Sequence, residues 1–182
     1  MTDTSCGTRD KVKVIPHPQT RIPHLKTRIQ PSAMKQEDTV NLPASKSATH
    51  RLAVNLHCTT SWFNRVSAEW LAPYDLSLQQ FNVLRILRGQ HPQPSRAVLV
   101  QERMIDRMSN VSRLIEKLRH KGLVERHTCS ADRRAVDIII TDKGLALLAE
   151  LDEAEQTWLK TFEVLTPEEM DTLNRLLAKL RR

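Results

Sequence analysis

Residues 108–126, MSNVSRLIEKLRHKGLVER, decide the fold, because a helical pattern runs there directly into a strand-like one. Four apolar residues recur at the spacing that places side chains on one helix face: Val111, Leu114, Ile115 and Leu118. Gly122 stands where a helix C-cap is expected. We therefore predict a helix over 108–122 that buries one face and leaves the opposite face polar.

Two short strands are predicted next, LVERHTC at 123–129 and AVDIIIT at 135–141. The turn between them carries one acid and two adjacent arginines: Asp132, Arg133 and Arg134. A surface turn needs polar residues, but it does not need two neighbouring guanidinium groups. This turn, placed just before Val136, Ile138 and Ile140, is therefore a candidate functional site.

Upstream, SLQQFNVLRILRGQ at 77–90 predicts a helix with the apolar stripe Phe81, Leu84 and Leu87. Ser77 as N-cap and Gln80 three residues later form the pattern of a capping box, and Gly89 ends the helix. HPQPS at 91–95 is predicted to be a rigid linker. Ser95 is predicted to cap a short helix that carries Val98, Leu99 and Met104, followed by a turn at 105–107.

Longer helical patterns flank this central region. The first begins near Ser47 and ends at Pro73, which breaks helices. Thr141 or Asp142 is predicted to cap a second helix over 143–162. TPEEMDTLNRLLAKLRR at 166–182 predicts a third, with proline in the first turn, acids early and cations late. The expected fold is mainly α with a small β-hairpin.

The N-terminal 48 residues differ from the rest. Five of the nine prolines lie there, and no helical or strand period is visible. Such a segment buries too little apolar surface to offset its ordering entropy, so we predict that 1–48 is disordered. It is either a basic arm that touches DNA phosphates or an extension upstream of a true start at Met34, and we favour the second interpretation.

Composition limits the function. The net charge of +7 and the pI of about 9.7 indicate a polyanionic partner, and nucleic acid is the commonest. Residues 95–134 hold ten Lys or Arg against five acids, whereas 145–171 hold one against eight. Catalytic and phosphate-loop motifs are absent, which argues against an enzyme and against a cofactor. Without an apolar run or a secretory signal, a cytoplasmic protein with no membrane contact is expected.

The helix at 108–122, the KGLVER that follows, the D-x-R turn and TDKG at 141–144 together resemble the MarR family of bacterial winged helix-turn-helix regulators. The resemblance covers roughly 50–182. It implies a winged-helix domain over 49–182, in which 49–73 and 142–182 form a homodimer and 77–141 bind double-stranded DNA. The expected function is a repressor that binds a pseudo-palindromic operator and is relieved by a small ligand. Three features depart from the family: the 48-residue extension, a longer turn in ERMIDRMS, and Met108 where a small polar residue is commoner.

The recognition helix supplies the first group of candidate DNA contacts. Its polar face holds Ser109, Asn110, Ser112, Arg113, Glu116 and Lys117. Asparagine can pair with adenine and arginine with guanine, so we predict contacts from this face and from the turn before it: Arg107, Ser109, Asn110, Ser112, Arg113 and Lys117. The alternative is a solvated helix face. A winged helix can also serve as a protein-interaction module, which a neutral or acidic face would have indicated.

The wing supplies the second group. Arginine favours a narrow minor groove, so Arg134 is predicted to enter it, with Asp132 orienting the guanidinium. By resemblance Asp132 and Arg134 are the family pair, and Arg133 adds a phosphate contact. The alternative is a charged hairpin tip that keeps the protein soluble.

Aromatic and cysteine residues allow two further predictions. Trp62, Phe63 and Trp70 are candidates to line an effector pocket, although aromatics at helical spacing are more often core or dimer interface. Some regulators of this type sense oxidants through a cysteine in the first helix, where Cys58 lies, but a structural thiol is the commoner role. The three cysteines have no CxxC spacing, and His120, His127 and Cys129 do not match a metal site.

Overall fold

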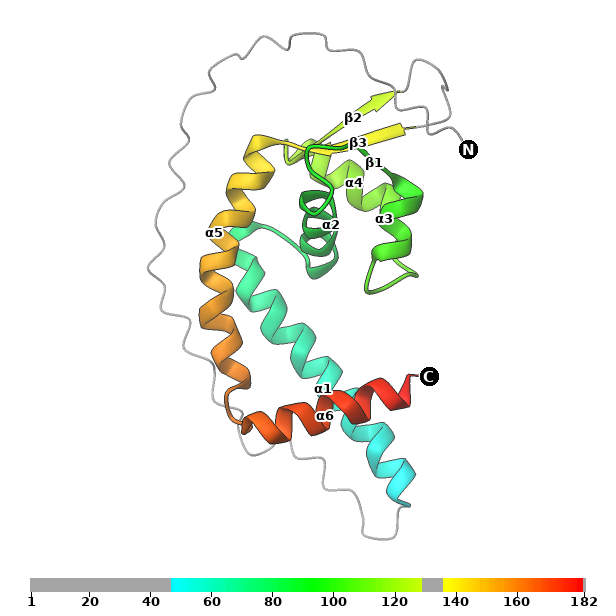
Figure 1. Ribbon diagram of the computed structural model, residues 1–182, viewed down its shortest axis with the longest axis vertical. Helices are drawn as coiled ribbons and strands as arrows, with labels where there is room; N and C mark the ends of the chain where they lie inside the picture. The colour runs from blue at the N-terminus through cyan, green and yellow to red at the C-terminus, as the bar shows by residue number, and fades with distance from the viewer. Residues whose placement is uncertain (1–46, 129–135, 182) are drawn as a thin grey trace.

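The computed structural model describes residues 47–128 and 136–181. Figure 1 shows one lobe that contains the small sheet, with two long helices running down from it and the last helix crossing the view below. The elements are α1 (Ala48–Leu71), η2 (Ala72–Tyr74), α2 (Leu78–Arg88), β1 (Ser95–Arg96), α3 (Ala97–Arg103), α4 (Val111–His120), β2 (Val124–Thr128), β3 (Val136–Ile140), α5 (Asp142–Leu159), η3 (Lys160–Phe162) and α6 (Pro167–Leu180). The predicted class, mainly α with a β-hairpin, is confirmed.

Several of the local capping signals work as the sequence predicts. The Ser77 hydroxyl accepts from the Gln80 N–H at 3.2 Å, and the Gln80 side chain accepts from the Ser77 N–H at 3.0 Å. Thr141, not Asp142, caps α5 by accepting from the Gly144 N–H at 3.1 Å. Thr166 caps α6 with a capping box. The C-cap of α4 is Lys121, so the predicted cap Gly122 stands one residue further on, where it takes a left-handed φ of 69°. Each signal acts within three or four residues and is therefore visible in the sequence.

The sheet contains a third strand that the sequence pattern did not predict. β3 lies between β1 and β2, and both pairs are antiparallel. Ser95 stands opposite Ile138 in β1, so the prediction that Ser95 caps the short helix is wrong. The N-cap of α3 is Arg96, whose side chain makes no capping hydrogen bond. Ser95 pairs with Ile138 of β3, which lies about forty residues away in the sequence, and no local pattern reveals this pairing.

One hydrophobic core holds the lobe together. The predicted stripe of α2 is buried, and so are Val111, Ile115 and Leu118 of α4. Ile138 and Ile140 of β3 close the core from the sheet side, while Leu148 and Leu151 of α5 enter it from the long helix. α5 is therefore anchored in the lobe by its first half.

The short helix α3 buries other residues than expected. Val98 is 69% exposed, whereas Val100 is fully buried. Met104 is buried but stands just after the last helical residue, as the C-cap. The helix has seven residues, Ala97–Arg103, and its N-cap lies one residue later than predicted, at Arg96 instead of Ser95.

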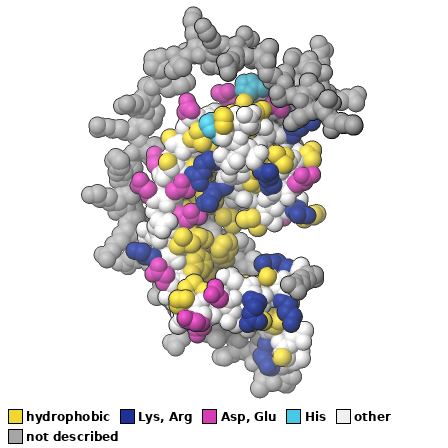
Figure 2. Space-filling view, viewed as in Figure 1, with side chains coloured by type: hydrophobic (Ala, Val, Ile, Leu, Met, Phe, Trp, Pro, Cys, Tyr) yellow, Lys and Arg dark blue, Asp and Glu magenta, His cyan; other side chains and the backbone are white. Residues whose placement is uncertain are grey.

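The flanking helices leave apolar side chains uncovered. Exposed leucines lie on the first turns of α1 and along α6: Leu52, Leu173, Leu176 and Leu180. On the face shown in Figure 2, hydrophobic side chains gather between the lobe and α6. Among the described helices, none combines the length and the apolarity that a membrane crossing requires. Met34 and the rest of the predicted N-terminal extension up to residue 46 lie outside the described residues.

Candidate nucleic-acid interface

Asp106 organises the turn that leads into α4. Its carboxylate accepts hydrogen bonds from the Met108 N–H at 3.0 Å and from the Ser109 hydroxyl at 2.9 Å. On the other side of the turn, the Ile105 N–H donates to the Asn82 side chain of α2 at 3.0 Å. These contacts tie the turn to itself and to α2, and they set the point at which α4 can begin.

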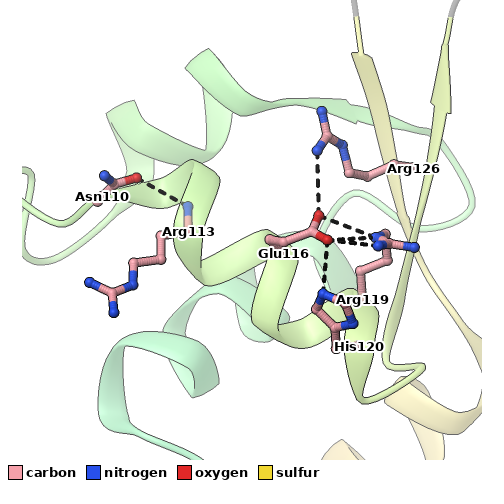
Figure 3. A network of polar contacts seen from close by, with 6 residues as sticks. All are labelled: Asn110, Arg113, Glu116, Arg119, His120 and Arg126. Atoms are coloured by element: carbon pink, nitrogen blue, oxygen red, sulfur yellow. Dashed lines mark hydrogen bonds and ion pairs between the residues drawn. The ribbon is translucent and has the colours of Figure 1, made fainter.

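The recognition helix begins at Val111, not at residue 108. Asn110 is its N-cap, and the Asn110 side-chain oxygen accepts from the Arg113 N–H at 3.0 Å (Figure 3). The predicted helix start at residue 108 is therefore wrong. Met108 and Ser109 donate hydrogen bonds to Asp106 in the turn, and Asn110 serves as the N-cap, so the helix starts only after them. Ser109 and Asn110 lie before the helix rather than on its face. The cap uses the side-chain amide oxygen of Asn110, Oδ1, and leaves its side-chain NH2 group without a role in the cap.

The remaining predicted contacts are exposed on or beside α4. Ser112, Arg113 and Lys117 lie on the helix face opposite the buried stripe, and Arg107 is exposed in the turn. An open groove between α3 and the start of α4 is lined in part by Val98, Met108 and Ser112. The first turn of the helix thus presents polar, cationic and apolar groups together, which is the mixture that base edges and thymine methyl groups require.

The wing turn lies outside the described residues. β2 and β3, which flank it, form a regular antiparallel pair with Glu125 opposite Ile139 and His127 opposite Asp137. Asp132, Arg133 and Arg134 fall in the gap at 129–135, so their predicted roles stay predictions.

Four residues that the sequence did not single out as contacts form a polar cluster, three of them on α4 and one on β2. Glu116 accepts from Arg119 through Nη2 at 2.7 Å and Nε at 3.2 Å, and it lies 3.0 Å from His120 Nε2. Arg126 of β2 joins from the wing, with Nη1 at 3.6 Å from the Glu116 carboxylate (Figure 3). The i,i+3 and i,i+4 spacings within the helix could have indicated the first two pairs. The Arg126 contact depends on how the strand folds back.

Electrostatics agrees with this geometry. The hydrogen bond from Arg119 lowers the pKa of the Glu116 carboxyl below its ordinary value, and the nearby charges of Arg119, His120 and Arg126 act in the same direction. Glu116 is therefore ionised at neutral pH. The acid in the middle of the recognition face is paired with cations.

The three predicted pocket aromatics belong to one cluster. Trp62 meets Phe162 edge-on at 5.7 Å between ring centroids, and Phe63 meets Trp158 at 5.8 Å. Trp70 stacks on Trp158 at 5.0 Å and touches Phe81 of α2. The indole N–H groups of Trp70 and Trp158 are buried and have no hydrogen-bond partner among the described residues. The cluster joins α1, α2, α5 and η3.

The other candidate ligands are not brought together. Cys58 is half-buried on α1, and Cys129 lies outside the described residues. His120 contacts Glu116, whereas His127 of β2 lies 3.3 Å from Glu125. Within residues 47–128 and 136–181, no group of three His, Cys, Asp or Glu side chains is placed to hold a metal ion.

Two ion pairs connect the lobe to the long helix α5. Arg88 of α2 binds Asp152 in a bidentate manner, at 2.6 and 3.0 Å. One turn away, Arg85 binds Glu155 at 3.0 and 3.2 Å. Both pairs join the helix beneath the recognition helix to α5. Arg88 uses two nitrogens on Asp152, whereas Arg85 uses Nη1 alone on both oxygens of Glu155, so only the Arg88 pair is a forked contact.

The Arg88–Asp152 pair predicts a specific pH dependence of stability. The hydrogen bond from Arg88 lowers the pKa of Asp152 below its ordinary 3.8, so this carboxylate contributes stability that is present above pH 3.8 and lost as pH falls through the lower, folded-state pKa. The Asp152 side chain is 44% exposed, so we expect Asp152→Asn to cost at most about 1 kcal/mol at pH 7.

Urea unfolding of both proteins between pH 7 and about pH 3 measures the effect. The difference between wild type and Asp152→Asn should hold down to about pH 4 and shrink below it. A difference that stays constant across this range would show that the substitution acts through packing.

The chain is similar to members of one family of known proteins. Residues 74–135 match the profile of the MarR family. The MarR transcription factor of Planctomyces limnophilus is 30% identical, with 73% of this chain and 97% of that chain covered and a TM-score of 0.56. Bordetella bronchiseptica BpsR, described with the regulation of its DNA binding by 6-hydroxynicotinic acid, is 26% identical over 72% and 99% of the two chains, with a TM-score of 0.63. A mutant MarR of E. coli complexed with operator DNA is 27% identical over 71% and 93%, with a TM-score of 0.59.

These matches agree with the order of helices and strands in the structure. The profile covers α2, β1, α3, α4 and β2 and ends just before β3, and the solved structures of BpsR and of the Planctomyces limnophilus protein cover 72% and 73% of this chain. A helix-turn-helix, a wing and long flanking helices occur here in the family's order, so the chain belongs to the MarR family of winged-helix transcription regulators.

Proposed function

We propose that the protein is a homodimeric repressor that binds a pseudo-palindromic operator and releases it when a small ligand binds. The observation that carries this proposal is the recognition helix α4. Its stripe is buried against the core, its start is fixed by Asp106 and Asn110, and its free face presents Ser112, Arg113 and Lys117. E. coli MarR, a relative, has been crystallised with operator DNA.

The contacts divide by position. Residues at the N-terminal end of a recognition helix reach base edges, so Arg113 and the free amide NH2 of Asn110 are proposed to read bases. Arg107, Ser109, Ser112 and Lys117 are proposed to complete this interface. In the wing, Arg134 is proposed to enter the minor groove with Asp132 orienting it, and Arg133 to contact a phosphate.

Dimerisation is supported by the uncovered leucines. Leu173, Leu176 and Leu180 of α6 are about half exposed and follow the i, i+3, i+7 spacing of one helix face. Leu52 of α1 adds a similar surface. A second copy related by twofold symmetry would bury both, and it would place two recognition helices about 34 Å apart, one DNA turn.

Ligand control is supported by the aromatic cluster. Trp70 and Trp158 carry buried indole N–H groups without partners, and Phe81 connects the cluster to α2. A ligand that entered among these rings would push directly on the helix that supports α4. The relative BpsR is regulated by a small aromatic acid.

We expect Arg113→Ala to weaken operator binding by about 1–3 kcal/mol and binding to random DNA much less, because a bidentate base contact is lost. The operator is first selected from a random DNA pool, and affinities are then measured by fluorescence anisotropy. Lys160→Ala, in η3 and far from α4, is the matched control for loss of one cation. Equal losses on both DNAs would make Arg113 a phosphate contact, and a failure to select any sequence would contradict the proposed function.

A further inference from the structure

Glu116 is an acid on the face of α4 that is proposed to contact DNA, where a negative charge is unexpected. On α4 it lies one turn after Arg113 and one turn before His120, on the face opposite the buried Val111, Ile115 and Leu118. An acid on this face should repel phosphate and weaken binding. A free carboxylate could instead accept a hydrogen bond from a cytosine amino group.

The contacts of Glu116 argue against both simple roles. Arg119 forks onto the carboxylate, His120 approaches one oxygen, and Arg126 approaches the other from the wing strand. The carboxylate is therefore surrounded by cations from its own helix and from β2 (Figure 3). It is not offered to a base, and its negative charge is compensated within the protein.

We propose that Glu116 is a positioning residue that gathers Arg119 and Arg126 into one phosphate-binding pair at the C-terminal end of the recognition helix. This inference rests on the proposed DNA-binding function. Phosphate is the ligand because the pair lies at the end of α4 remote from its N-terminal, base-reading turn. Phosphate contacts of this kind set the register of a protein on the duplex.

The guanidinium chemistry permits this arrangement. Arg119 uses Nε and Nη2 on Glu116, so the hydrogens of Nη1 stay available. Arg126 touches Glu116 only at 3.6 Å, and both arginine side chains are more than 40% exposed. Arginine side chains that are already held lose less rotamer freedom when DNA binds. Glu116 also joins the wing to the helix, so both guanidinium groups reach one stretch of backbone together.

The test is Glu116→Gln, which keeps the shape and removes the charge. We expect it to weaken binding about three- to ten-fold on operator and random DNA alike, although an acid near DNA has been removed. The negative slope of log affinity against log salt concentration should become shallower by about 0.9, which corresponds to the loss of one phosphate contact. The matched control is Glu102→Gln on α3, because the Glu102 carboxylate forms no ion pair with the described residues. It should bind as tightly as wild type or more tightly.

Arg126→Ala and the double variant complete a thermodynamic cycle. Arg126→Ala should lose about as much affinity as Glu116→Gln, and the double variant little more, because both break the same pair. Thermal unfolding of each variant identifies a temperature at which all are folded. An effect through stability alone would shift melting and leave the salt slope unchanged, which would overturn the inference.

Two further outcomes are equally decisive. If Glu116→Gln binds DNA as tightly as wild type or tighter, Glu116 is only a repelling charge and the inference fails while the proposed function stands. If only operator binding is lost, Glu116 reads a base and the inference also fails. If wild type binds no DNA at all, it is the proposed function that fails.

Discussion

Replacing Gly144 with alanine is expected to destabilise the protein by about 1–3 kcal/mol, because the methyl group has no room. A Cβ at this position would lie 2.4 Å from the carbonyl oxygen of Leu123 and 2.7 Å from a side-chain carbon of Ile140. The Leu123 carbonyl cannot simply withdraw, because it accepts the Thr141 N–H at 3.1 Å. Relief would have to shift the start of α5 against the sheet.

Urea unfolding measures this loss, with Gly89→Ala as the matched control. Gly89 has a right-handed φ of −66°, and the nearest atoms to a Cβ there lie at 3.5 and 3.6 Å, which is ordinary contact. Gly89→Ala should therefore leave stability unchanged or raise it by up to about 1 kcal/mol. Equal effects at the two glycines would contradict the close packing of α5 on the sheet.

Leu176→Glu is expected to turn the proposed dimer into a monomer and to lower operator affinity by about 100-fold or more. Leu176 is 52% exposed in the single chain, so the substitution should leave the monomer folded. In the dimer it would bury an unpaired charge, which costs several kcal/mol. A monomer binds only one half-site. In the dimer, binding of the first half-site raises the effective concentration of the second recognition helix at the other half-site, which increases affinity by a factor of about 10² to 10⁴.

Sedimentation at micromolar concentration and anisotropy on the operator measure the two effects. Asn174→Glu adds the same charge to α6 but lies outside the row of Leu173, Leu176 and Leu180, and it should stay dimeric and bind normally. A Leu176→Glu protein that is still dimeric would show that α6 does not form the interface. A wild-type monomer that binds a single half-site would contradict the dimer proposal itself.

The sequence by itself determined the features that depend on near neighbours. The capping box of Ser77 and Gln80, the buried stripe of α4 and the two wing strands follow from residues two to four positions apart. Such signals act through a helix turn or a strand alternation, whose geometry is the same in every protein. The family resemblance came from the same stretch, and the comparisons confirm it.

Only the tertiary structure decided what distant segments do to one another. Ser95 looked like a helix cap but pairs with β3, and α4 starts at Val111 because the turn before it bonds to itself and to α2. Helical spacing brings Glu116 within reach of Arg119 and His120, but its contact with Arg126 exists only because β2 folds back beside α4. Gly144 looked like a helix-start residue, but its missing side chain makes room for Leu123 and Ile140. For Ser95, for Gly144 and for the contact of Glu116 with Arg126, the partner is set by folding of the chain in space, and spacing along the sequence does not reveal it. The hydrogen bonds of Asp106 and Asn110, by contrast, span only two or three residues.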